Sequence, residues 1–161
     1  QNSLDFCPFS GYHELMCSLI GDVAPPLQGT YVLWFDAKQP LSVQWRRDRS
    51  ALLQPGAYLY VGSALGPGGL QARLRRHTGD ATARRPHWHI DYLTGLMRPA
   101  EVRFAVGAQS QECTWVQTLA AAGAHFPARG FGSSDCRQRC PAHLLAAPAW
   151  WSISTVESLL T

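Results

Sequence analysis

Apolar and polar positions along the chain predict a small sheet with helices packed on it. Runs rich in β-branched and aromatic residues, which are typical of strands, occupy residues 30–36, 41–45, 56–64 and 101–107. Apolar residues recur at helical spacing in 70–77, 111–123 and 151–160. This order predicts an α+β fold, a small and mostly antiparallel β-sheet flanked by helices.

Three parts of the chain are expected. Residues 1–26 read as an N-terminal helical extension, because apolar residues at helical spacing run up to Gly21. Residues 27–148 form the main domain, and 149–161 supply a closing helix packed on it. The N-terminal helix is a candidate contact with a second copy of the chain or with a partner protein.

The helix at 70–77 presents two faces. Leu70 and Leu74 share one of them, while Arg73 and His77 lie four residues apart on a neighbouring face. On the residues alone, this second face is a solvated basic surface. The segment 87–93 is compatible with a helix or a loop, and 143–147 with a short strand or a helix.

Composition describes an ordinary globular domain of 161 residues, 46% hydrophobic and 16% charged, with a net charge of +3. Nearly all of the basic residues are arginines, whose planar fork suits phosphate oxygens, although an arginine-rich codon usage gives the same bias. No apolar run has the length of a membrane span and no secretory signal is apparent. The five cysteines favour a reduced, cytoplasmic protein.

Two of the predicted strands carry a tyrosine two residues from a glycine, in 29–31 and in 60–62. Taken alone, these tyrosines are half-buried sheet residues. Together with 72–77, however, they resemble the signature of the GIY-YIG nucleases. The closest resemblance is to the Uri-type branch, a domain of unknown function sometimes fused to endonuclease III. It rests on PGAYLYVGSALGPGGLQARLRRH, HWHIDYL, EC before a helix and GFGSSDC followed by HL.

This resemblance runs from about Gly29 to Leu145. The sequence departs from the named signature at Thr30 and Val61, where the family name has isoleucine. Both replacements are β-branched at non-catalytic positions. The resemblance implies a GIY-YIG-like fold and a Mg²⁺-dependent endonuclease, with Mn²⁺ as a substitute metal. Such an enzyme cuts DNA to leave a 5′-phosphate and a 3′-hydroxyl, and the fusions suggest DNA repair or processing.

The same resemblance assigns the catalytic roles. Tyr31 is implied as the general base or as the partner of a metal-bound water, with Tyr60 beside it. Arg73 is implied to stabilise the transition state and His77 to orient groups or carry protons. Glu112, which opens the helix at 111–123, is implied as the metal ligand. Without the resemblance, a glutamate at that position is a favourable partner of the helix dipole.

Further residues are expected to bind the nucleic acid, DNA in the first place. They come from the second tyrosine motif, from the basic helix and from the arginine and histidine segment that follows it: Gly62, Ser63, Arg76, Arg84, Arg85, His87 and His89.

Three alternatives stay open. One is a nucleic-acid-binding module with the same fold and no turnover. Another is an iron site on 87–91, where two histidines and an aspartate would share one face of a strand. The third is a zinc site of Cys136, Cys140 and His143, completed by Cys113 or Asp135. Otherwise Ser134, Asp135 and His143 are expected to be buried around the active-site loop.

Overall fold

The structure is a computed structural model that describes residues 24–79 and 84–161. Residues 1–23 of the expected N-terminal helical extension therefore lie outside the described residues.

The central sheet has four strands in the order β5-β1-β4-β6, and each pair is antiparallel. Its strands are β1 (Gly29–Ala37), β4 (Gly56–Ala64), β5 (Glu101–Val106) and β6 (Leu144–Ala146). A hairpin of β2 (Leu41–Arg46) and β3 (Arg49–Leu53) forms a second sheet of two strands. The predicted α+β fold is confirmed.

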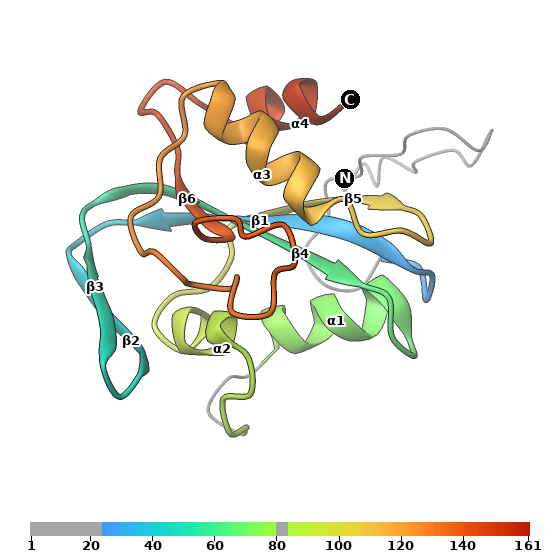
Figure 1. The fold of residues 1–161 in the computed structure, drawn as a ribbon, viewed down its shortest axis with the longest axis horizontal. Coiled ribbons are helices and arrows are strands. Elements are labelled where there is room, and N and C mark those ends of the chain that lie inside the picture. The colour runs from blue at the N-terminus through green and yellow to red at the C-terminus, as the bar shows by residue number, and fades with distance from the viewer. Residues whose placement is uncertain (1–23, 80–83) are drawn as a thin grey trace, which may run out of the picture.

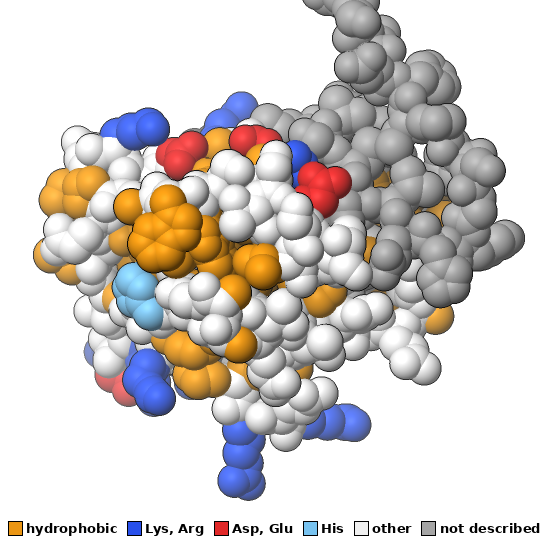
Figure 2. Space-filling view, turned by 90° about the horizontal axis from the view of Figure 1, so that it is seen from above, with side chains coloured by type: hydrophobic (Ala, Val, Ile, Leu, Met, Phe, Trp, Pro, Cys, Tyr) orange, Lys and Arg blue, Asp and Glu red, His pale blue; other side chains and the backbone are white. Residues whose placement is uncertain are grey.

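Helices cover both faces of the central sheet (Figure 1). On one side lie α1 (Gly69–Thr78) and α2 (His89–Thr94), and on the other lie α3 (Glu112–Ala121) and α4 (Ile153–Leu160). Figure 2 shows the face that carries α3 and α4, where hydrophobic side chains gather near the centre and Lys and Arg side chains stand mainly at the margin.

Two hydrophobic cores result from the alternation of side chains along β1 and β4. Leu33 and Phe35 point to the side of α1, where Leu70 and Leu74 are fully buried as their helical spacing predicts. Val32 and Trp34 of β1 point to the other side, against α3 and α4. Because each buried Leu contributes about 1.5–3 kcal/mol relative to an exposed one, both cores hold the sheet in place.

Several local expectations are resolved by the structure. The segment at 143–147 contains a strand, β6, at Leu144–Ala146. The closing helix expected at the C-terminal end is α4, whose N-cap Ser152 accepts from the Thr155 amide at 3.4 Å. The segment 87–93 becomes helical at its end, in α2. Strand β3 was not expected, because 49–53 begins with polar residues and alternates poorly.

Gly62 lies directly opposite Tyr31 across the β1–β4 pair. A Cβ atom built on Gly62 would lie 2.5 Å from the Tyr31 hydroxyl oxygen and 2.6 Å from Cζ. Because Gly62 has no side chain, it leaves room for the Tyr31 side chain to extend over β4.

The substitution Gly62→Ala should destabilise the protein by about 1–3 kcal/mol, because the added methyl group must displace a tyrosine that is 1% exposed. Urea denaturation measures this change. Gly66→Ala is the matched control, since a Cβ atom there meets nothing within 4 Å. Equal stability of the two variants would contradict the close packing.

Candidate active site

The centre of the site is a hydrogen bond between Tyr31 on β1 and His77 on α1. The Tyr31 hydroxyl lies 2.7 Å from His77 Nε2, and the two rings lie 5.5 Å apart. His77 is 2% exposed, and its other ring nitrogen, Nδ1, is buried without a hydrogen-bond partner in the described residues. The sequence-based interpretation of Arg73 and His77 as one solvated basic face is therefore wrong for His77.

Burial decides the protonation of this pair. Burial, together with the charge of Arg73, lowers the pKa of His77 from 6.5 to about 3, so the imidazole is neutral near pH 7. Burial also raises the pKa of Tyr31 well above its usual 10, and the opposing influence of Arg73 is smaller. Arg73 by itself does not turn Tyr31 into a phenolate base.

Tyr60 stands beside this pair on β4. Burial and the nearby carboxylate of Glu112 raise the pKa of Tyr60, while Arg73 acts in the opposite direction. The same two charges act on Tyr31. The charges of Arg73 and Glu112 thus act on both Tyr31 and Tyr60, so four of the five expected catalytic residues lie near one another, and the fifth, His77, is bonded to Tyr31.

Arg73 is held by an aromatic residue that the sequence interpretation missed. Its guanidinium carbon lies 4.1 Å from the centre of the Trp88 ring, and that of Arg76 lies 4.7 Å from it. Stacking of this kind orients a guanidinium without neutralising its charge. No spacing in the sequence signals this contact, because it depends on how α2 packs against α1.

Glu112 reaches the cluster from the start of α3. Its Oε2 lies 3.0 Å from His143 Nδ1, and its carboxylate also accepts hydrogen bonds from Ser63. Burial alone would raise the pKa of Glu112, but these hydrogen bonds from His143 and Ser63 outweigh it, so the pKa lies below its ordinary value. Glu112 is therefore a carboxylate near pH 7.

The donors around Glu112 fit a magnesium ion. The carboxylate side chain is 22% exposed and has the Ser63 hydroxyl and two phenols near it, all of them hard oxygen donors. Mg²⁺ prefers such ligands and commonly keeps several waters beside one or two protein carboxylates. Glu112 is the side chain of this set that would hold it.

The other residues expected to bind substrate are placed differently from one another. Arg76 makes an ion pair with Asp91 at 2.8 Å, which ties α1 to α2. Arg84 donates to the Arg76 carbonyl oxygen, and it lines a small depression together with the exposed Arg85. His87 is exposed and packs edge-on against Trp88.

The residues of 87–91 do not share a metal site. Asp91 accepts from the backbone amides of His87 and Trp88 and so caps the start of α2. His89 Nδ1 instead accepts from the Gly132 amide at 2.9 Å, which holds the loop after Ala128 in place. The segment is helical from His89 onward, where the iron hypothesis required a strand through 87–91, so that hypothesis is wrong.

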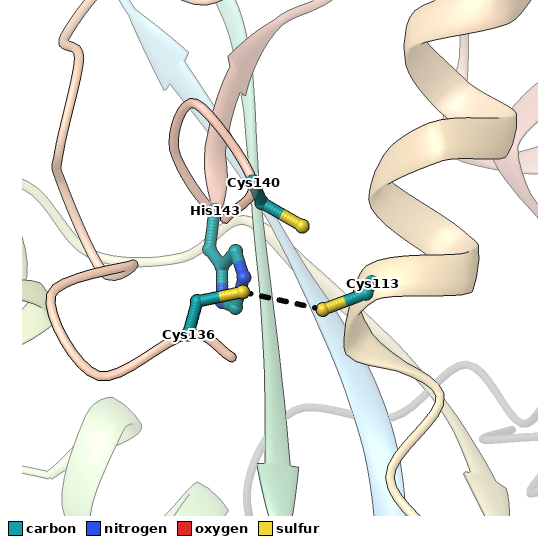
Figure 3. Close-up of side chains that lie close together, drawn as sticks. All are labelled: Cys113, Cys136, Cys140 and His143. Atoms are coloured by element: carbon teal, nitrogen blue, oxygen red, sulfur yellow. Dashed lines mark hydrogen bonds between the residues drawn. The ribbon is translucent and has the colours of Figure 1, made fainter. Parts of the chain in front are cut away.

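A different group of metal-binding side chains does come together. Cys113, Cys136, Cys140 and His143 place their ligand atoms within 4.8 Å of one another (Figure 3). Cys113, not Asp135, is thus the fourth member of the set. Asp135 and Ser134 are exposed, and only His143 of the three residues expected around the loop is buried.

These features define a small α+β domain with phenol, guanidinium and carboxylate groups beside its central sheet. The chain matches the family described as Domain of unknown function DUF123 over residues 30–159, and it belongs to that family. The match continues into α4, farther than the resemblance to Leu145 suggested. No curated protein and no solved structure matches the chain. Among the described residues, no helix is long and apolar enough to cross a membrane.

The buried, neutral His77 gives a prediction for stability against pH. The unfolded chain takes up a proton near pH 6.5 and the folded chain only near pH 3, so the His77 contribution to stability is complete above pH 6.5 and is lost toward pH 3. His77→Gln should flatten the fall in unfolding free energy between pH 6.5 and 4.5 by up to about 1.4 kcal/mol per pH unit.

Denaturant titrations at several pH values measure this slope. His125→Gln replaces an exposed histidine and should keep the wild-type slope. If His77→Gln has the same slope as wild type and the control, His77 is not held neutral by burial.

Proposed function

We propose that this protein is a Mg²⁺-dependent endonuclease that hydrolyses DNA phosphodiester bonds, with Mn²⁺ as a substitute, leaving a 5′-phosphate and a 3′-hydroxyl. One observation carries the proposal: Tyr60, Arg73 and Glu112 lie near the hydrogen-bonded Tyr31–His77 pair. Tyr31, Tyr60, Arg73 and Glu112 come from four separate elements. These are the residues that the resemblance to GIY-YIG nucleases implies for catalysis.

Arg73 supplies the positive charge for the phosphate. Phosphodiester hydrolysis builds negative charge on the phosphate oxygens, and a guanidinium binds two of them through parallel hydrogen bonds. The Trp88 ring lies against the Arg73 guanidinium without neutralising its charge, so Arg73 would meet the phosphate as a full cation.

The Tyr31–His77 pair can take the proton from the attacking water. Because Tyr31 is a neutral phenol in the free protein, it acts as a relay: it gives its own proton to Nε2 of neutral His77 as it accepts one from the water. His77 becomes positively charged in this step. The negative phosphate nearby offsets the cost of that charge, so the relay is favoured only with substrate in place.

Glu112 would hold the magnesium ion. When bound, this ion supplies charge stabilisation at the phosphate and makes a coordinated water easier to deprotonate. His143 and Ser63 fix the Glu112 carboxylate by hydrogen bonds. The carboxylate is therefore held in one position and does not rotate freely.

DNA would approach along α1 and the segment after it. Arg73, Arg84 and Arg85 lie on this side of the sheet, opposite the α3 and α4 face of Figure 2. Contacts of this kind to the phosphate backbone position a nucleic acid without reading its sequence. The expected repair or processing role and the cytoplasmic location stay predictions.

The proposal predicts cleavage of labelled DNA that requires both Mg²⁺ and Glu112. Single-stranded, duplex and flap substrates are incubated with wild type in Mg²⁺ and in EDTA, and with Glu112→Gln in Mg²⁺. The variant keeps the size of the side chain and one acceptor oxygen but loses its charge. We expect a loss of about 100-fold or more, since a metal ion contributes several kcal/mol at the transition state.

Glu101→Gln is the matched control, because its side chain on β5 is 43% exposed and pairs with Arg103. It should cleave like wild type. Binding of DNA with no cleavage of any substrate would support a non-catalytic binding module instead. Cleavage that survives Glu112→Gln would remove Glu112 from the mechanism.

A further inference from the structure

A second group of chemically active side chains lies next to the candidate active site. Cys113 belongs to the first turn of α3, Cys136 and Cys140 to the loop after α3, and His143 to the residues just before β6. Figure 3 shows the three sulfurs and the imidazole directed into one small region. Segments about 20 residues or more apart in the chain are therefore brought together with their metal-binding atoms facing inward.

The spacing of these atoms suits a tetrahedral ion. Zinc–sulfur bonds of about 2.3 Å place neighbouring sulfurs about 3.8 Å apart. Here the Cys113 and Cys136 sulfurs are 3.4 Å apart, and all four ligand atoms lie within 4.8 Å of one another. Three thiols and one imidazole form a soft donor set that suits zinc and does not suit magnesium.

The orientation of His143 gives an independent reason. Its Nδ1 faces the Glu112 carboxylate at 3.0 Å, whereas Nε2 is buried and has no hydrogen-bond partner in the described residues. A buried nitrogen without a partner costs free energy, and native proteins rarely leave one. Ligation of an ion through Nε2 would satisfy this nitrogen.

A disulfide accounts for less of the arrangement. Joining Cys113 to Cys136 would leave the buried Cys140 as a lone thiol and His143 Nε2 still without a partner. All three thiols are free in the structure. A single ion, in contrast, uses all four side chains at once.

We propose that the protein binds one structural Zn²⁺ through the sulfurs of Cys113, Cys136 and Cys140 and through Nε2 of His143. The three thiols release their protons to solvent on binding. The ion joins the start of α3 to the loop before β6. Because ligation at Nε2 keeps the remaining proton of His143 on Nδ1, the ion also makes His143 a fixed donor to Glu112. The proposal does not depend on nuclease activity.

The test is metal content. Reduced wild-type protein is loaded with Zn²⁺, passed over a chelating resin and analysed for zinc per chain. About one equivalent is expected to remain. Cys140→Ser and His143→Gln should retain at least about tenfold less zinc against the competitor, as loss of one of four ligands requires. The double variant Cys7→Ser, Cys17→Ser keeps the set intact and should bind zinc like wild type.

Co²⁺ gives a readout that does not need variants to fold. Wild type loaded with Co²⁺ should show the intense visible and thiolate charge-transfer bands of a tetrahedral site, and Zn²⁺ should displace them. In the zinc-loaded protein, a long-range ¹H–¹⁵N spectrum should show His143 protonated on Nδ1.

Octahedral Co²⁺ without thiolate bands would overturn the proposal. So would zinc that is lost in the Cys7→Ser, Cys17→Ser control, a Cys113–Cys136 disulfide in the purified protein with no zinc bound, or a His143 ring protonated on Nε2.

Discussion

Tyr31 extends across the bare backbone of Gly62 and bonds to His77 at 2.7 Å, and this one contact links β1, β4 and α1. The glycine provides the space, the buried helix face provides the imidazole, and burial keeps both rings neutral. Every other group of the candidate site is arranged around this contact. Arg73 lies one helical turn before His77, and Tyr60 lies two residues before Gly62.

The two faces of the sheet hold their charged groups in different ways. On the α1 side, Arg73 and Arg76 stack on Trp88 and Asp91 caps α2, so the basic groups are oriented by packing. On the α3 side, Glu112 is fixed through His143, which belongs to the group of three cysteines and one histidine. A zinc ion there would fix His143, and His143 in turn would fix the Glu112 carboxylate by its hydrogen bond. The loop before β6 would then determine where that carboxylate lies.

Much of this could be predicted from the sequence, because strands, helices and the order of the tyrosine, arginine and glutamate residues are local signals. Leu70 and Leu74 had to be buried together, and so their helix had a defined inner face. Contacts between distant segments could not be predicted. Nothing local distinguishes Cys113 from Asp135 as a fourth ligand, or shows that Trp88 faces Arg73, because both depend on how separate elements pack.

Single-turnover DNA cleavage in Mg²⁺ by Tyr31→Phe and Tyr58→Phe tests the proposed role of Tyr31 most directly. Each variant loses one hydrogen-bonded hydroxyl. That of Tyr31 bonds to His77, whereas that of Tyr58 donates to the Gln54 carbonyl at 2.5 Å, outside the site. A proton relay predicts a loss of about 10²–10⁴-fold for Tyr31→Phe and near wild-type cleavage for Tyr58→Phe. Equal rates for the two variants would contradict the proposed role of Tyr31.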